Sequence, residues 1–257
     1  MKKLYGKNII LTGASSGIGR EMLNILSLYS DVKIVAVARH IENIPRIDGV
    51  IYPFSSDVST SEGVDSVFEY AQTVFDKIDI FIANAGFAYL EKLNAPDWEH
   101  IEKIYNLNVF SPIYSLEKLV EKDSSPKIFV CTISGAGLAP LHGYSLYCST
   151  KAALHQFVQT YRYEKKNSLQ LTAVYPVATK TDFFDKATGK QGTPLPFPTQ
   201  SAKTVAKKII RGIELGKKNI YPSLLFKIFY PIGRAFPFLM KMYSLIEKKK
   251  TEKWLRS

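Results

Sequence analysis

The sequence predicts an α/β protein built on a doubly wound, parallel sheet with helices on both faces. Short β-rich runs alternate with helical stretches over the first two hundred residues, and a glycine-rich turn follows the first run. The runs also lack the polar alternation of half-exposed strands, so both faces of each strand are expected to be covered. Strands that alternate with helices form parallel sheets with right-handed crossovers. We therefore expect a Rossmann-like fold.

The expected elements follow one another in a regular order. The expected strands are Ile9–Thr12, Val32–Ala38, Val50–Phe54, Ile78–Ala83, Lys127–Ile133 and Leu169–Tyr175. The expected helices are Gly17–Tyr29, Ser61–Phe75, Trp98–Val120, Leu146–Lys166 and a segment from about Ser201 to Leu215. Residues 177–200 are rich in Thr, Lys, Gly and Pro and predict a loop or a mobile lid. Without a low-complexity linker or an internal repeat, residues 1–215 are expected to form one domain and residues 216–257 a basic, apolar extension.

The charge of the chain is concentrated in its last quarter. Residues 201–257 hold 14 Lys and Arg against 3 Asp and Glu, whereas residues 1–200 hold 20 of each. The body is therefore not expected to bind nucleic acid or another polyanion. Two cysteines give no disulfide framework, and the N-terminus shows no secretory signal, so a cytoplasmic protein is expected.

A glycine-rich turn joins the first strand to the first helix. It runs Thr12-Gly-Ala-Ser-Ser-Gly-Ile-Gly19, with glycines at 13, 17 and 19. Such glycines permit a tight turn and a close approach of pyrophosphate to backbone N–H groups at a helix N-terminus. The sequence thus predicts a dinucleotide site that includes Ser15, Ser16 and Ile18.

The end of the second expected strand bears on the choice of cofactor. Ala38 stands where an acidic residue would accept from a ribose 2′-hydroxyl, and Arg39 follows it. A guanidinium can pair with a 2′-phosphate, so NADP(H) is expected in preference to NAD(H). The alternative is that Arg39 is a solvated charge at a strand end. Asp57 and Val58 are expected to touch adenine, although Asp57 could instead cap a helix.

Tyr147 and Lys151 stand four residues apart in the expected helix Leu146–Lys166, so they lie on one helical face. An ammonium beside a phenol is expected to lower the phenol's pKa from about 10 toward neutrality. A hydroxyl of that kind suits proton transfer to a carbonyl oxygen. Tyr144 is the rival phenol, but it stands seven residues before Lys151. The four histidines have no metal-ligand spacing, so no metal site is expected and they are predicted to be structural.

These motifs together resemble the short-chain dehydrogenase/reductase family over about residues 7–215. The resemblance rests on the glycine turn, Asn84-Ala85-Gly86, Asn108, Ser134, Tyr147 with Lys151, and Pro176 with Thr181, in family order. It implies a homodimer or homotetramer with a small carbonyl or alcohol substrate.

The same resemblance implies a role for each residue. Tyr147 would be the general acid or base, Lys151 would lower its pKa and hold the nicotinamide ribose, and Ser134 would hold the substrate oxygen. Asn108 would anchor a water chain, Asn84–Gly86 would line the cofactor cleft, and Pro176 and Thr181 would lie at the nicotinamide end. Val177 departs from the family glycine. Because a β-branched residue avoids positive φ, the backbone there is expected to differ.

The C-terminal extension combines cations with bulky apolar residues. Lys227, Arg234, Lys241 and Lys248 recur every seven residues, which predicts a stripe near one helical face. This pattern suits an interfacial helix on an anionic membrane, whereas Pro231 and Pro237 are expected to break it. The alternative is that the apolar residues cover a substrate cleft or a subunit interface. Either role points to an apolar or lipid-like substrate.

The sequence leaves three functions to compare. The first is NADP(H)-dependent interconversion of a carbonyl and an alcohol. The second is a catalytically idle nucleotide-binding module that tethers to a membrane or a partner, which has no reason to keep Asn108, Ser134, Tyr147 and Lys151 together. The third is a sugar-nucleotide epimerase, for which the chain is too short to hold a separate substrate lobe.

Overall fold

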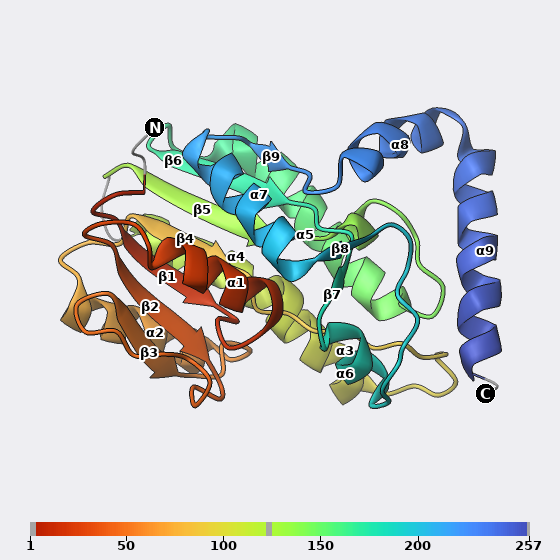
Figure 1. The fold of residues 1–257 in the computed structure, drawn as a ribbon, viewed down its shortest axis with the longest axis horizontal. Coiled ribbons are helices and arrows are strands. Elements are labelled where there is room, and N and C mark those ends of the chain that lie inside the picture. Colours follow the sequence, from red (N-terminus) through yellow and green to blue (C-terminus); the bar gives the residue numbers. More distant parts are fainter. Residues whose placement is uncertain (1–3, 122–124, 256–257) are drawn as a thin grey trace.

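A seven-stranded parallel sheet forms the centre of the structure, a computed structural model that describes residues 4–121 and 125–255 (Figure 1). The strands are β1 (Asn8–Thr12), β2 (Lys33–Ala38), β3 (Ile51–Ser55), β4 (Ile80–Ala83), β5 (Lys127–Thr132), β6 (Leu169–Val174) and β9 (Asn219–Ile220). Their order is β3-β2-β1-β4-β5-β6-β9, and every neighbouring pair is parallel. The order reverses direction between β1 and β4, the place where ligands bind in open sheets of this kind.

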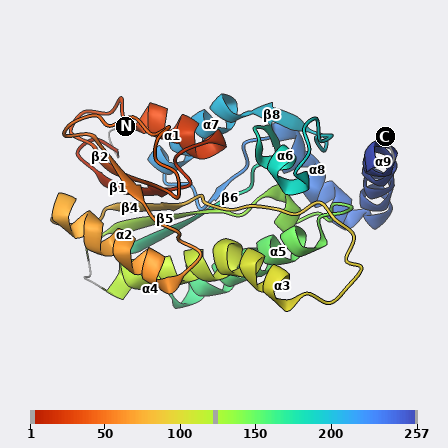
Figure 2. The same cartoon turned by 90° about the horizontal axis from the view of Figure 1, so that it is seen from below.

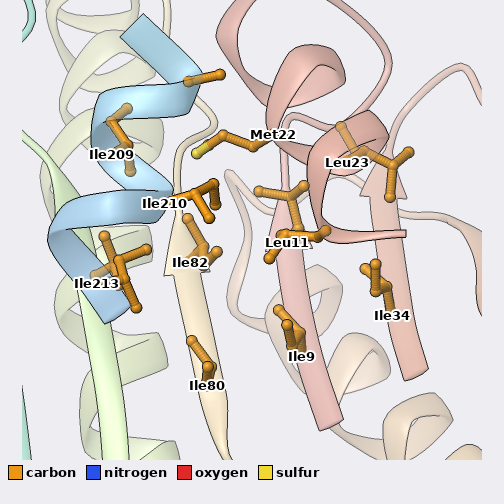
Figure 3. Close-up of a cluster of buried hydrophobic side chains, with 14 of the residues drawn as sticks. Ile9, Leu11, Met22, Leu23, Ile34, Ile80, Ile82, Ile209, Ile210 and Ile213 are labelled. Carbon is orange, nitrogen blue, oxygen red and sulfur yellow. The ribbon is translucent and has the colours of Figure 1, made fainter. Parts of the chain in front are cut away.

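Helices cover the two faces of this sheet in separate layers (Figure 2). Helices α1 (Gly17–Leu26) and α7 (Ala202–Glu214) lie on one face, and α2 (Ser61–Val74), α4 (Ser111–Glu121) and α5 (Ser145–Glu164) lie on the other. Aliphatic side chains of β1, β2 and β4 pack against α1 and α7 in one core (Figure 3). Phe68, Phe81 and Phe129 stack in the other core, with ring centroids 5.5 and 5.4 Å apart. The predicted fold class is confirmed.

All six predicted strands are present. Each observed strand end either agrees with the predicted end or differs from it by one or two residues. The sequence did not reveal β9, which pairs with β6 through only two residues, Asn219 and Ile220. A run that short has no periodicity to detect.

Two predicted segments differ from the structure. The helix expected over Trp98–Val120 divides into α3 (Trp98–Tyr105), a π-helical turn η1 (Asn106–Phe110) and α4. The loop or lid expected over residues 177–200 contains β7 (Ala178–Lys180), α6 (Phe183–Thr188) and β8 (Thr199–Ser201). β7 and β8 pair with each other in a small parallel sheet, which gives this segment backbone hydrogen bonds of its own.

The C-terminal extension forms two helices at one end of the molecule (Figure 1). They are α8 (Leu224–Ala235) and α9 (Pro237–Leu255). Pro231 lies inside α8 without ending it, so that part of the prediction was wrong, whereas Pro237 begins α9, where no N–H is needed. The four evenly spaced cations are thus shared between two helices and do not form one stripe. In the described part of the chain, every helix is too short or too polar to cross a membrane.

Candidate active site

A cavity of about 950 Å³ follows the carboxyl edge of the sheet and continues to α8 and α9. Most of the predicted site residues line it: Gly13, Ser15, Ser16, Gly17, Ile18, Arg39, Asp57, Val58, Asn84, Ala85, Gly86, Ser134, Tyr147, Lys151, Pro176 and Thr181. Gly19 and Asn108 do not line the cavity, but each packs against or bonds a residue that does: Gly19 lies against Gly13, and Asn108 bonds the Phe87 backbone. The structure therefore brings residues from 13 to 181 to one place.

The glycine turn has the shape that a pyrophosphate requires. Gly13 and Gly17 have φ of 69° and 56°, which favour glycine. A Cβ on Gly19 would lie 2.0 Å from the Gly13 carbonyl oxygen, so the helix could not approach the strand with any larger residue there. Ser16 is the N-cap of α1, and its side chain makes no capping hydrogen bond. The first N–H groups of α1 are therefore suited to bind phosphate.

Thr12 fixes the strand end beside this turn, although it was not among the predicted site residues. Its hydroxyl oxygen accepts hydrogen bonds from the backbone N–H of Asn84 (3.0 Å) and of Ala85 (3.1 Å). The Asn84 amide in turn donates to the Thr12 carbonyl oxygen at 3.3 Å. Only the pairing of β1 with β4 brings these residues together, so the sequence offered no signal for this role.

The end of the cavity beside β2 carries basic side chains. Arg39 is exposed there and its carbonyl oxygen accepts a hydrogen bond from the Ser55 hydroxyl at 2.9 Å. His40, which we predicted to be structural, also lines this end. Asp57 does not cap α2, because Thr60 does. Burial alone would raise the pKa of Asp57, but hydrogen bonds from Ser59 and the nearby Arg39 charge bring its pKa below the usual value.

Tyr147 and Lys151 face the cavity from α5, but they do not pair as predicted. The Lys151 Nζ lies 5.8 Å from the centre of the Tyr147 ring and donates instead to the Thr132 carbonyl oxygen at 3.1 Å. Burial raises the pKa of Tyr147 to about 12, against an opposing interaction with Ser134, and burial lowers the pKa of Lys151 to about 8. The expected near-neutral phenol was therefore wrong. At pH 7 Tyr147 holds its proton and can donate it.

Ser134 occupies a strained position at the end of β5. Its φ of 109° and ψ of 152° belong to a region that glycine favours, at a cost of about 1–3 kcal/mol. The Ser134 hydroxyl donates to the Pro176 carbonyl oxygen at 3.4 Å, and the Gly135 N–H donates to the same oxygen at 2.7 Å. Val177 has no positive φ, which agrees with its β-branched side chain. Apart from glycines, positive φ within the described ranges occurs at Asp31 and Ser134.

Asn108 lies in the π-helical turn and clamps the backbone next to the site. Its Oδ1 accepts from the Phe87 N–H at 3.1 Å, and its Nδ2 donates to the Phe87 carbonyl oxygen at 2.9 Å and to Thr150 at 3.1 Å. A Cβ on Gly86 would lie 3.0 Å from Asn108 Oδ1 and 3.4 Å from Lys151 Nζ. Asn108 therefore sets the wall beside Lys151, and its part in a water chain stays a prediction.

Tyr144, the rival phenol, also lines the cavity. Its ring centre lies 6.4 Å from that of Tyr147, and burial raises its pKa as well. The Tyr144 hydroxyl is buried without a hydrogen-bond partner among the residues that the structure describes. Tyr144 is thus a near neighbour of Tyr147 that differs in its contacts, which makes it a natural control.

Apolar side chains form the outer half of the cavity. They come from α6 (Phe183 and Phe184), which was not predicted to belong to the site, and from α8 and α9. The apolar residues of α8 and α9 therefore line the cavity, as the alternative to membrane contact expected. A Cβ on Gly135 would lie 3.1 Å from the Phe226 ring, so α8 packs directly behind the Ser134 loop. In residues 4–121 and 125–255 no cluster of three His, Cys, Asp or Glu side chains is arranged to hold a metal ion.

Comparison with known proteins identifies the family. The sequence profile of the short chain dehydrogenases matches residues 7–192. The chain belongs to this family. Human epidermal retinol dehydrogenase 2 is 28% identical over 242 residues, which are 88% of this chain and 77% of that protein.

Solved structures of short chain dehydrogenases share the fold. One from Sphingobium yanoikuyae, in complex with NADPH, has a TM-score of 0.75 at 22% identity and covers 91% of this chain and 95% of its own. Another from Burkholderia phymatum, in complex with NAD, has a TM-score of 0.79 at 18% identity and covers 93% and 96%. The chain is thus an oxidoreductase of a family whose solved structures hold NADPH in one case and NAD in another.

Proposed function

We propose that this chain is an NADP(H)-dependent oxidoreductase that interconverts a ketone or aldehyde and an alcohol, on an apolar or lipid-like substrate. The observation that carries the proposal is the meeting of Tyr147, Ser134 and Lys151 on the wall of the cavity that begins at the glycine turn. A bound nicotinamide cofactor would supply the hydride. The turn fits the pyrophosphate of such a cofactor, because Gly13 and Gly17 adopt positive φ and the N-terminus of α1 has no side-chain cap.

The residues of the chain supply the proton and hold the carbonyl. Tyr147 donates its proton to the carbonyl oxygen, since its raised pKa keeps the phenol neutral at pH 7. Ser134 donates a hydrogen bond to the same oxygen, and Lys151 places a positive charge beside the phenolate that forms. Asn108 holds the Phe87 backbone next to Gly86, and the Thr132 carbonyl oxygen holds the Lys151 ammonium. In the reverse direction Tyr147 accepts the alcohol proton.

The preference for NADP(H) rests on the adenosine end of the cavity. Arg39 and His40 line it, and Ala38 leaves no carboxylate at the end of β2 to repel a 2′-phosphate. We expect NADPH to bind more tightly than NADH, and Arg39→Asp to narrow or reverse the difference in Kd. Equal affinities of the parent protein for the two cofactors would contradict the role of Arg39.

The apolar substrate is supported by the outer half of the cavity, and the similar human protein is a retinol dehydrogenase. With this reaction we propose a cytoplasmic homodimer or homotetramer whose C-terminal helices reach a membrane surface.

Tyr147→Phe tests the reaction, with Tyr144→Phe as its matched control. Ketones and alcohols, including long-chain 3-oxo compounds, would be screened by the absorbance of NADPH. We expect Tyr147→Phe to bind NADPH normally and to lose turnover by about 10²–10⁴-fold, the usual effect of removing a general acid. Tyr144→Phe should keep its turnover. Unchanged turnover in Tyr147→Phe would overturn the mechanism, and NADPH binding without turnover in the parent would favour the idle module.

A further inference from the structure

Helices α8 and α9 carry an unusual concentration of exposed apolar side chains. Of the twenty-one large apolar residues that are exposed in the described ranges, eleven lie between residues 224 and 246. Phe229, Phe238 and Ile246 are 58%, 59% and 62% exposed. We call these eleven residues the α8–α9 patch. A single protein surface rarely exposes so many together unless it meets a partner or a membrane.

The charge around the patch distinguishes between these two occupants. Residues 215–246 contain five Lys or Arg and no Asp or Glu. Lys227, Arg234 and Lys241 are exposed among the apolar residues of the patch. A two-fold contact with a second copy would place two such cationic sets together without a carboxylate from this segment. An anionic lipid surface instead offers the complementary charge and an apolar interior.

Polar contacts on the opposite side of α9 hold the patch outward. The Tyr243 hydroxyl donates to the Phe197 carbonyl oxygen at 2.7 Å, and the Phe197 N–H donates to the Glu247 carboxylate at 3.1 Å. Tyr243 and Glu247 are one helical turn apart, so they lie on one face of α9. Because that face is bound to the loop at residues 195–197, the face with Phe238 and Leu245 is left to the outside.

The patch and the cavity share residues. Phe229 of α8 and Met242 and Ile246 of α9 belong to the patch and are more than half exposed, and they also line the cavity that reaches Tyr147. The outer mouth of the cavity therefore opens through the patch. A substrate that enters by this mouth passes mainly apolar side chains of α6, α8 and α9 before it meets Ser134 and Tyr147 at the inner end.

We propose that the α8–α9 patch docks on an anionic membrane, and that the substrate is an amphiphile that passes from the bilayer through this mouth to Tyr147. Its carbonyl or hydroxyl lies at the inner end, and its hydrocarbon chain lies against α8 and α9. The proposal rests on the proposed reaction for the identity of the inner site. Docking itself does not depend on that reaction.

The full chain can be tested with vesicles of phosphatidylcholine, with and without phosphatidylglycerol. We expect co-sedimentation with the anionic vesicles, and release by high salt because the electrostatic attraction is screened. Phe238→Ser combined with Leu245→Ser removes two exposed side chains that do not line the cavity, and should weaken vesicle binding about tenfold or more. Leu28→Ser, at a position 82% exposed on the body, is the matched control and should bind like the parent.

Two activity measurements separate docking from chemistry. With a short, water-soluble carbonyl the double variant should turn over like the parent, and with a long-chain carbonyl in anionic vesicles it should be slower about tenfold. A parent that stays in the supernatant, or a double variant that binds vesicles fully, would overturn the proposal. If the parent does not bind vesicles and the molecular mass in solution of the double variant is half that of the parent, the patch is an interface with a second copy. That result would also overturn the membrane proposal. If the parent binds vesicles but turns over neither substrate, the proposed carbonyl–alcohol reaction is refuted and the docking proposal is not.

Discussion

The inner and outer ends of the cavity are built on opposite principles. At the inner end polar groups are buried and most have a fixed partner: Lys151 on Thr132, Asn108 on Phe87. At the outer end the side chains of α8 and α9 are apolar and exposed, and the cations among them point to solvent. The inner end thus holds atoms in place for a reaction, whereas the outer end offers a surface. The polar residues at the inner end and the apolar residues of α8 and α9 thus differ in both burial and contacts.

The two ends are nevertheless in direct contact. The Phe226 ring of α8 packs on Gly135, next to the strained Ser134, and stacks at 5.7 Å on Tyr230. A movement of α8 would therefore change the packing of Phe226 against the Ser134 loop. The difference between the two ends of the cavity can be tested by making the same substitution at each end.

The largest contrast is expected between Lys151→Met and Lys241→Met. Lys151→Met should lower kcat by about 10²–10³-fold, because the charge beside the Tyr147 phenolate is lost. The same change should raise the free energy of unfolding by at most about 3 kcal/mol, since the pKa of Lys151 falls to about 8 on burial and its charge is costly in the folded state. Lys241→Met, on the surface, should alter both by little. Denaturant unfolding and steady-state rates check this, and a parent-like kcat in Lys151→Met would contradict it.

A smaller contrast is expected between two glycines. Alanine at Gly19 would bring Cβ to 2.0 Å from a backbone oxygen of Gly13, which cannot move without opening the turn. We expect a loss of about 3 kcal/mol and a fall in Tm of roughly 6–12 °C. Alanine at Gly233 would meet the Met240 sulfur at 2.5 Å, but that side chain is flexible and helical alanine is favoured over glycine. Its Tm should be close to the parent's. Equal losses would mean that α8 and α9 pack as rigidly as the turn.

The smallest contrast is in pH dependence. Reduction needs Tyr147 protonated and Lys151 charged, and their pKa values are about 12 and about 8. The rate should be level below pH 7.5 and should fall above pH 8, by at most tenfold per unit, as Lys151 loses its proton. Residues 216–257 contain no histidine, so vesicle binding should stay level from pH 6 to 9. A rate that rises through pH 8 would show that Tyr147 must first lose its proton.

Much of the site could be predicted because its residues are tied to the backbone pattern. Glycines after the first strand, Arg39 after the second and Ser134 after the fifth all follow strand ends, and parallel strand ends meet at one edge. The electrostatics could not be predicted in the same way. Spacing on α5 places Lys151 beside Tyr147, but the partner that its ammonium chooses, the Thr132 carbonyl oxygen, belongs to another element.

The sequence by itself determined the parallel sheet, the nucleotide turn and the set of residues at the sheet edge, because periodicity and strand-end position are local properties. Tertiary structure decided the rest. Burial raised the pKa of Tyr147 rather than lowering it, the π-helical turn aimed Asn108 at Phe87, and Ser134 adopts a positive φ that the sequence did not indicate. The contacts of α8 with the Ser134 loop turned a basic, apolar tail into the outer wall of the cavity. These features depend on which groups lie close in space, and distance along the chain does not contain that information.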